Sequence, residues 1–179
     1  RIRENFPLHG LEIQPAKCEL FVQGFSPNEV SGIHDLISET LPGCRLTAAD
    51  SEVELLGAAI FESGVPRALR DKSVAYELLF RRISYVGTHV AAYILQRSAG
   101  VPRLTYLLRA SPVFAAKEDL ARVDEQFAEA FGSILKISLS GDALIQLSLP
   151  TSSGGMGIPM PSTIALAAFT ASCHAAEDD

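Results

Sequence analysis

The sequence predicts an α+β fold that is mostly α, in which a small strand–helix–strand segment precedes a bundle of helices. Three observations predict it. Two short apolar runs, at residues 17–22 and 53–61, lie on either side of one helical pattern. From residue 66 onward, apolar side chains recur at helical spacing. With 179 residues, 47% of them hydrophobic and 20% charged, the chain can bury a core of its own.

The first strand is expected over residues 17–22, and the first helix follows it with a clear start. Ser26 can serve as the N-cap, a proline occupies the first helical position, and Glu29 lies three residues after the cap. This is the capping-box pattern, in which the two side chains satisfy free N–H groups of the first turn. Pro42 and Gly43 are expected to end the helix.

Between this helix and the bundle we expect two segments. Residues 45–50 are predicted to be a connector. Residues 53–61, which include the apolar run LLGAAI, are predicted to be a strand or the edge of a hairpin.

The bundle is expected to hold four helices in its first part. The first begins near Pro66, Thr88 can cap the second, the third ends before Ser111, and the fourth covers residues 118–137. The fourth has the strongest apolar period. The first is expected to bury one stripe of side chains, which comprises Leu69, Ala75, Leu78, Leu79, Ile83 and Val86.

A short apolar segment at residues 144–149 and a small-residue loop at 151–157 follow. The loop contains GGMG but lacks the spacing of a phosphate-binding loop, so a tight structural turn is predicted. Prolines are expected to keep the chain extended as far as Pro161. Ser162 can then cap a last helix over residues 164–174.

Positive charge is concentrated in residues 64–112. This segment has eight Lys and Arg against two acidic residues, whereas the rest of the chain has seven basic and nineteen acidic residues, for a net charge of −6. A basic block in an acidic protein often faces a polyanion. It is equally often the solvated side of amphipathic helices, and charge alone leaves both interpretations open.

The residues show no complete active site. The histidines lack metal-binding spacing, no pair of aspartates follows a strand as two-metal chemistry needs, and Cys44, between glycine and arginine, has no placed histidine. No apolar run approaches the roughly 20 residues of a membrane span. With no signal-peptide pattern and no CxxC pair, an intracellular, reduced protein is expected.

Four stretches together resemble reverse transcriptases of non-LTR retroelements. Residues 9–20 (HGLEIQPAKCEL) are similar to the family's "GLELNPxKCE" segment, and residues 55–60 (LLGAAI) to its "LLGxPI" primer-grip hairpin. Residues 101–112 (VPRLTYLLRASP) resemble "xPKLLYLLRxSP". Residues 146–150 and 154–158 (QLSLP and GGMGI) resemble "QASLPxxxGGLGI". The matches occur in the family's order and cover nearly the whole chain.

This resemblance implies three domains: the end of a polymerase palm at residues 1–61, a helical thumb-like domain at 62–138, and a connecting segment at 139–179. The family's catalytic aspartates, in a "YxDD" turn that holds two Mg²⁺ ions, would lie upstream. Because the sequence starts with Arg1, we expect a fragment of a longer polypeptide with further palm and fingers. We expect it to be inactive alone and to hold no metal or cofactor itself.

The resemblance also implies site residues. Lys17 matches a family lysine near the departing pyrophosphate, where an ammonium could donate a proton or offset charge. Leu56 and Gly57 would place the primer terminus by close backbone approach. Two positions depart from the family pattern, Arg103 in place of lysine and Ala59 in place of proline. The residues expected to contact phosphates of the template–primer duplex are Arg70, Lys72, Arg81, Arg82, Arg103 and Arg109.

Purely structural interpretations of these residues stay open. Lys17 also suits the entrance of a strand, and Leu56-Gly57 an ordinary β-turn. The whole chain also fits a helical protein-interaction module without a nucleic-acid role, whose leucine and phenylalanine stripes are core and whose basic face is merely solvated.

Overall fold

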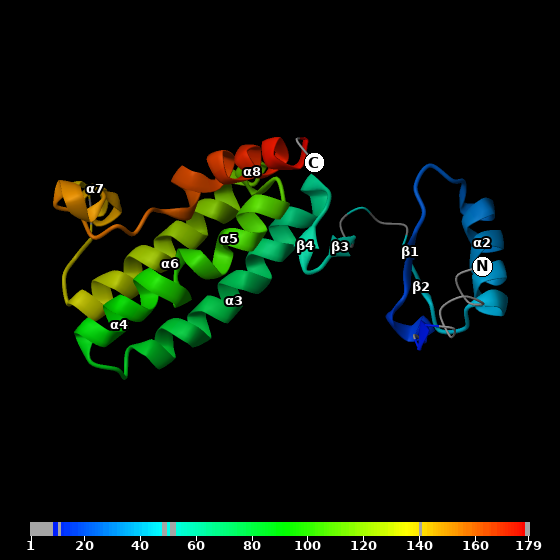
Figure 1. Ribbon diagram of the computed structural model, residues 1–179, viewed down its shortest axis with the longest axis horizontal. Helices are drawn as coiled ribbons and strands as arrows, with labels where there is room; N and C mark the ends of the chain where they lie inside the picture. The colour runs from blue at the N-terminus through cyan, green and yellow to red at the C-terminus, as the bar shows by residue number, and fades with distance from the viewer. Residues whose placement is uncertain (1–8, 11, 48–49, 51–52, 140, 178–179) are drawn as a thin grey trace. The chain divides into compact units, whose positions relative to one another are not determined.

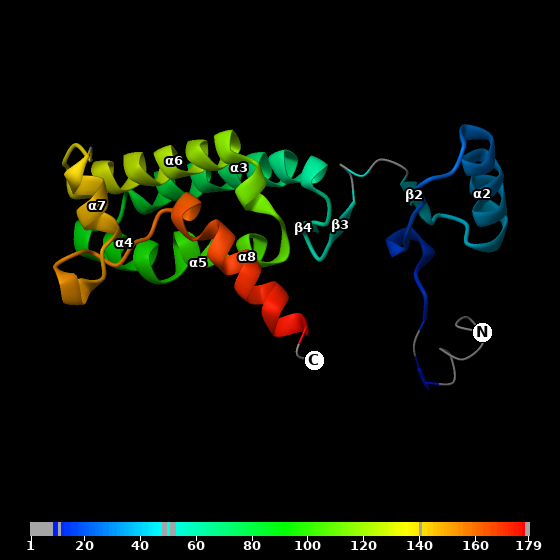
Figure 2. The same ribbon diagram turned by 90° about the horizontal axis from the view of Figure 1, so that it is seen from above.

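The computed structural model describes residues 9–10, 12–47, 50, 53–139 and 141–177. The chain divides into two compact units, Arg1–Val53 and Glu54–Asp179. The fold is α+β and mostly α, as the sequence predicts. Figure 1 and Figure 2 show a small strand–helix–strand unit and a larger helical unit. None of the described helices has the length and apolar character needed to cross a membrane.

The first unit is a β–α–β arrangement. Strand β1 (Glu19–Phe21) leads to helix α2 (Pro27–Thr40), and strand β2 (Arg45–Thr47) returns parallel to β1. The predicted capping box is confirmed at the start of α2. The Glu29 carboxylate accepts hydrogen bonds from the Ser26 hydroxyl at 2.7 Å and from the Ser26 N–H at 2.8 Å, and these two bonds lower the pKa of Glu29.

Two predictions for this unit were wrong. The expected connector at residues 45–50 contains β2, because a three-residue strand gains its order from pairing with β1 and not from a local apolar pattern. The predicted strand at 17–22 is also shorter. Lys17 ends a 3₁₀ helix, η2 (Pro15–Lys17), since the proline at its start favours a turn over a strand.

The second unit opens with a hairpin, which is one of the two predicted forms for residues 53–61. Strands β3 (Glu54–Leu55) and β4 (Ala58–Ala59) pair antiparallel across a two-residue turn. The turn residues Leu56 and Gly57 have φ values of 53° and 81°. Positive φ at both positions is the geometry of a type I′ turn, which matches the twist of paired strands.

The helices of this unit begin and end near the predicted positions. They are η4 (Glu62–Gly64), α3 (Val65–Ile83), α4 (Thr88–Ile94), the π-helix η5 (Leu95–Ala99), α5 (Val101–Ala110), η6 (Val113–Ala115), α6 (Lys117–Leu135), α7 (Asp142–Ser148), η7 (Thr151–Ser153) and α8 (Pro161–Glu177). Helix α3 packs against α6, and α8 packs against α5 and α6 (Figure 1). Thr88 is the first residue of α4 and Gly87 its N-cap, so the predicted threonine cap was one residue off.

The core of the helical unit centres on three aromatic rings. Tyr76 stacks on Phe80 with ring centroids 5.2 Å apart, and Phe127 meets both rings edge-on at 4.9 and 5.4 Å. The buried Tyr76 hydroxyl donates to the carbonyl of Gly100 at 3.0 Å. This burial raises the pKa of Tyr76 well above its usual range, and the nearby charge of Arg103 offsets part of the rise.

The predicted stripe of α3 is only partly correct. Leu69 and Ile83 are buried, but Ala75, Leu78 and Val86 are exposed. The helix turns a different face to the core because Tyr76 lies at its centre. Its ring packs on Phe127 and its hydroxyl finds a partner 24 residues away, which spacing along the helix does not reveal.

The N-terminus of α8 is capped by a side chain of another helix. Pro161 begins α8, so Ser162 lies within the first turn and is not the predicted cap. Both the N–H and the hydroxyl of Ser162 donate to the carboxylate of Asp124 on α6. A carboxylate in this place satisfies a free N–H and faces the positive end of the helix dipole.

We expect Asp124→Ala to lower the free energy of unfolding by about 1–3 kcal/mol, because two hydrogen bonds to a charged group are lost. Chemical denaturation followed by circular dichroism measures this. Glu125→Ala is the matched control: it removes the same charge from the next residue, which is exposed, and should change stability by no more than about 0.5 kcal/mol. Equal losses in the two variants would contradict a capping role for Asp124.

The Asp124 carboxylate also makes the stability of the protein depend on pH. Burial raises the pKa of Asp124, against the lowering effect of the Ser162 hydrogen bonds. The folded protein therefore binds a proton at a higher pH than the unfolded chain, so this group's contribution to stability falls as pH rises from the ordinary pKa through the raised one. The pH–stability profile of Asp124→Ala should lack this loss of stability between the ordinary and the raised pKa.

Candidate nucleic-acid interface

The turn of the β3–β4 hairpin presents the first candidate residues to solvent. Leu56 is 86% exposed, and a Cβ added to Gly57 would meet no other atom within 4 Å. The hairpin is tied to α5 by the Tyr106 hydroxyl, which donates to the carbonyl of Leu55 at 3.3 Å. The structure thus holds an open backbone turn next to α5, with a leucine in the left-handed region that such a side chain seldom adopts.

The predicted phosphate contacts lie on two helices of the same unit. Arg70, Arg81 and Arg82 are exposed on α3, the last two in its final turn. Arg103 and Arg109 are exposed on α5. Lys72 differs from the others, because it is half-buried on the side of α3 that packs into the bundle.

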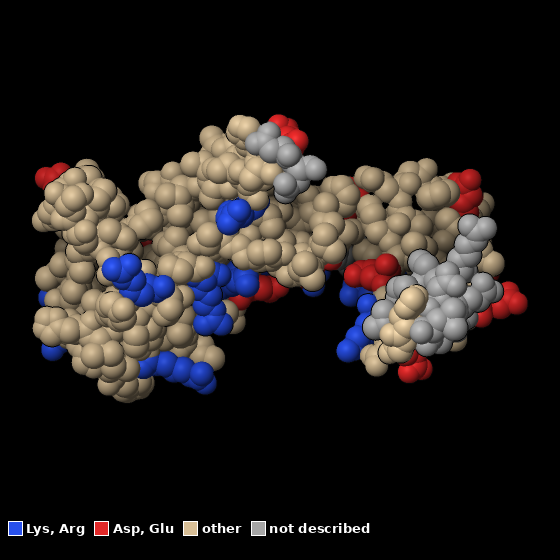
Figure 3. Space-filling view, in the orientation of Figure 1, with Lys and Arg blue, Asp and Glu red and all other residues tan. Residues whose placement is uncertain are grey.

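These arginines have no carboxylate partner among the described residues. Within that part of the chain, the ion pairs join Glu19 to Arg45, His34 to Asp35 and Asp119 to Arg122, and none involves a basic residue of α3, η5 or α5. Figure 3 shows several groups of Lys and Arg side chains on the helical unit, with few Asp or Glu on this face. The face therefore carries positive charge that is free to meet an anion.

Sequence reasoning undervalued three exposed residues of the segment that joins α3 to α5. Arg97 is exposed on η5, between the two helices that carry the predicted arginines, and Tyr85 and Tyr93 are exposed on either side of the start of α4. A signal was present in the sequence: no Asp or Glu occurs from residue 78 to residue 117. An acid-free stretch that contains five arginines indicates a surface for a polyanion more specifically than net charge does.

Lys17 belongs to the first unit, whereas all the nucleic-acid candidates belong to the second. It is exposed at the end of η2, and its backbone N–H donates to the carbonyl of Gln14 at 2.9 Å. A catalytic role for Lys17 stays a prediction.

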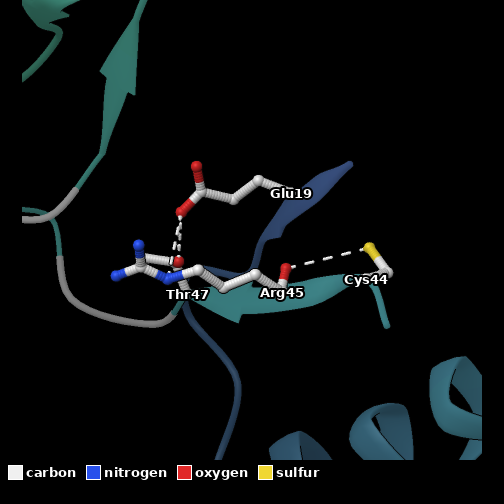
Figure 4. Close-up of polar contacts among 4 residues, drawn as sticks. All are labelled: Glu19, Cys44, Arg45 and Thr47. Carbon is white, nitrogen blue, oxygen red and sulfur yellow. Dashed lines mark hydrogen bonds and ion pairs between the residues drawn. The ribbon is translucent and has the colours of Figure 1, made fainter. Parts of the chain in front are cut away.

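The polar contacts of the first unit surround the nearby strand pair. Glu19 on β1 accepts a hydrogen bond from the buried Thr47 and pairs with Arg45 at 3.8 Å, both on β2. Figure 4 shows the Arg45 guanidinium directed towards Glu19 and away from Cys44, whose thiol donates to the Arg45 carbonyl at 3.8 Å. This cluster joins the two strands, which is a structural task.

No metal chemistry is assigned to the described residues. They contain no group of three or more His, Cys, Asp or Glu side chains placed to hold a metal ion. Comparisons with protein-family models, with curated proteins and with solved structures found no match for this chain.

Proposed function

We propose that the helical unit holds a template–primer duplex by its phosphates, as part of a reverse transcriptase of the non-LTR type. The observation that carries the proposal is the set of exposed arginines on α3, η5 and α5, which have no acidic partner among the described residues. Guanidinium groups bind phosphate oxygens in bidentate fashion, and a duplex presents phosphates without any requirement for exact spacing. Such a surface binds duplex of any sequence.

The hairpin turn and Lys17 have their own parts in this proposal. Leu56 and Gly57 would place the primer end against exposed turn backbone, and the positive φ of Leu56 is the kind of local strain that is found at functional sites. The exposed ammonium of Lys17 would offset charge on departing pyrophosphate or donate a proton to it.

Fluorescence anisotropy with labelled RNA–DNA hybrid duplexes tests the proposal. Two duplexes of equal length and unrelated sequence should bind with Kd values within about threefold of each other at about 50 mM salt, because phosphate contacts carry no sequence information. The proposal fails if neither duplex binds at that salt concentration, or if only one sequence does.

A protein-interaction module is the second candidate, and α2 is the observation that favours it. The helix has an apolar stripe but no buried residue, and its Leu36 is 60% exposed. An amphipathic helix whose apolar side chains are only partly covered within its own unit, such as half-buried Ile33 and Ile37, is suited to a protein partner. Absence of duplex binding, together with concentration-dependent association in sedimentation experiments that Leu36→Asp abolishes, would favour this candidate.

A further inference from the structure

Two tyrosines of the helical unit lie in solvent. Of the four tyrosines in the chain, Tyr76 is buried and Tyr106 is bonded to the hairpin. Tyr85 and Tyr93 are 86% and 63% exposed. In the described part of the chain, neither side chain makes a hydrogen bond or a ring contact. A large aromatic ring left in water is a surface that a ligand can cover with a gain in free energy.

The two tyrosines belong to the segment in which α3 leads to α4, at one end of the helical unit (Figure 1). Tyr85 follows the last turn of α3, and Tyr93 lies on α4, which has seven residues and is thus only about 10 Å long. Val90, Tyr93 and Arg97 recur at helical spacing along α4 and η5 and are all exposed, so they share an outer face.

The charged residues near these two tyrosines indicate which kind of ligand binds them. Exposed Arg81 and Arg82 shortly precede Tyr85 at the end of α3, and exposed Arg97 follows Tyr93 on the same face. No acidic residue occurs from residue 78 to residue 117, although Glu77 and Glu129 line the same pocket as Arg81. A protein partner would have to be strongly acidic as well as apolar. A single nucleic-acid strand combines phosphates with free aromatic faces, which stack on exposed rings, whereas a duplex keeps its bases stacked inside.

We propose that this end of the helical unit binds unpaired nucleotides, with Tyr85 and Tyr93 stacking on bases and the neighbouring arginines contacting phosphates. The inference rests on the proposed function and adds to it a single-stranded segment next to the duplex. Because stacking accepts every base, the site should show little sequence preference.

The test compares three fluorescent probes: an oligothymidylate of about 12 nucleotides, an abasic strand of the same length, and a blunt duplex. The abasic strand keeps the phosphates and removes the stacking surface. Wild-type protein should bind the oligothymidylate at least about tenfold more tightly than the abasic strand. The double variant Tyr85→Ala/Tyr93→Ala should lose about 30-fold or more in affinity for the oligothymidylate and should bind the abasic strand and the duplex as wild type does.

Matched variants separate stacking from folding. Tyr85→Phe/Tyr93→Phe keeps both rings and should retain the affinity. Ile145→Ala removes an exposed apolar side chain from α7 and should leave strand binding unchanged. Since both tyrosine side chains are exposed, the double alanine variant should also unfold at nearly the wild-type temperature.

The outcomes are distinguishable. Equal binding of the oligothymidylate and the abasic strand by wild type overturns the inference, and so does an unchanged affinity in the double alanine variant. Sedimentation gives a third outcome. If wild type is oligomeric, the double alanine variant is monomeric and the strand affinity is unchanged, the rings serve self-association and the inference is wrong. Failure of the duplex probe alone overturns the proposed function and leaves base-dependent strand binding as a separate result.

Discussion

The affinity of this protein for a template–primer duplex is expected to fall by roughly 250- to 1,000-fold between about 50 and 200 mM salt. The reason is counterion release: each arginine that neutralises a phosphate frees a cation from the nucleic acid. If about four to six of the basic residues in 64–112 reach phosphates, log affinity falls with log salt at a slope of roughly −4 to −5. Anisotropy titrations at a series of salt concentrations measure this slope.

Arg81→Ala/Arg82→Ala should flatten the slope by about one to two units, because each phosphate contact contributes about 0.9. Both side chains are exposed in the last turn of α3 and have no acidic partner among the described residues. Cations in that turn also favour the helix dipole, by about 0.3–1 kcal/mol each, so thermal unfolding of the variant must be checked alongside binding.

Lys117→Ala/Arg122→Ala is the charge-matched control. It also removes two positive charges, but from α6, where Arg122 already pairs with Asp119 at 3.0 Å. Its slope should equal that of wild type. A slope near zero in the unmodified protein would favour the protein-interaction module, and equal flattening in the two variants would show a diffuse field with no particular binding face.

Features that are set by residues close together in the sequence could be predicted from the sequence. The capping box at Ser26 and Glu29 satisfies itself within one turn of helix, and the structure has it as predicted. The hairpin at Leu56-Gly57 needs only a turn of the right geometry between two short apolar runs. The exposed arginines were also foreseeable, since an arginine without a nearby carboxylate in sequence is seldom buried.

The predictions that were wrong concern features that depend on contacts between residues far apart in the sequence. Strand β2 exists because its backbone pairs with β1 after a helix of 14 residues has intervened. The face that α3 buries is set by the bond from Tyr76 to Gly100, and the start of α8 is set by Asp124. Exposure of Tyr85 and Tyr93 is likewise a result of packing, because tyrosines at helical spacing are equally suited to a core.

Gly100→Ala is expected to reduce the free energy of unfolding by about 3 kcal/mol or more, the largest stability loss that we predict for a single methyl group. A Cβ on Gly100 would lie 2.4 Å from the carbonyl oxygen of Leu95 and 3.3 Å from the ring of Phe127. The oxygen is backbone and cannot rotate away as a side chain could. Urea denaturation of the variant measures the loss, and its expected magnitude corresponds to roughly 150-fold in the unfolding equilibrium.

The surrounding bonds leave Gly100 little room to move. Its N–H donates to the same Leu95 carbonyl at 2.9 Å, which closes the π-helix, and its own carbonyl accepts a hydrogen bond from the Tyr76 hydroxyl.

Gly87→Ala is the matched control, since a Cβ there meets nothing within 4 Å and φ is −56°. The stability of this variant should stay within about 1 kcal/mol of wild type. Tyr76→Phe removes the hydroxyl alone and should cost only about 1–2 kcal/mol. If Gly100→Ala were no worse than Tyr76→Phe, the close approach to Leu95 would not be what fixes this turn. Because Arg97 and Arg103 lie three residues on either side of Gly100, a displaced turn should also weaken duplex binding in whatever fraction of the variant remains folded.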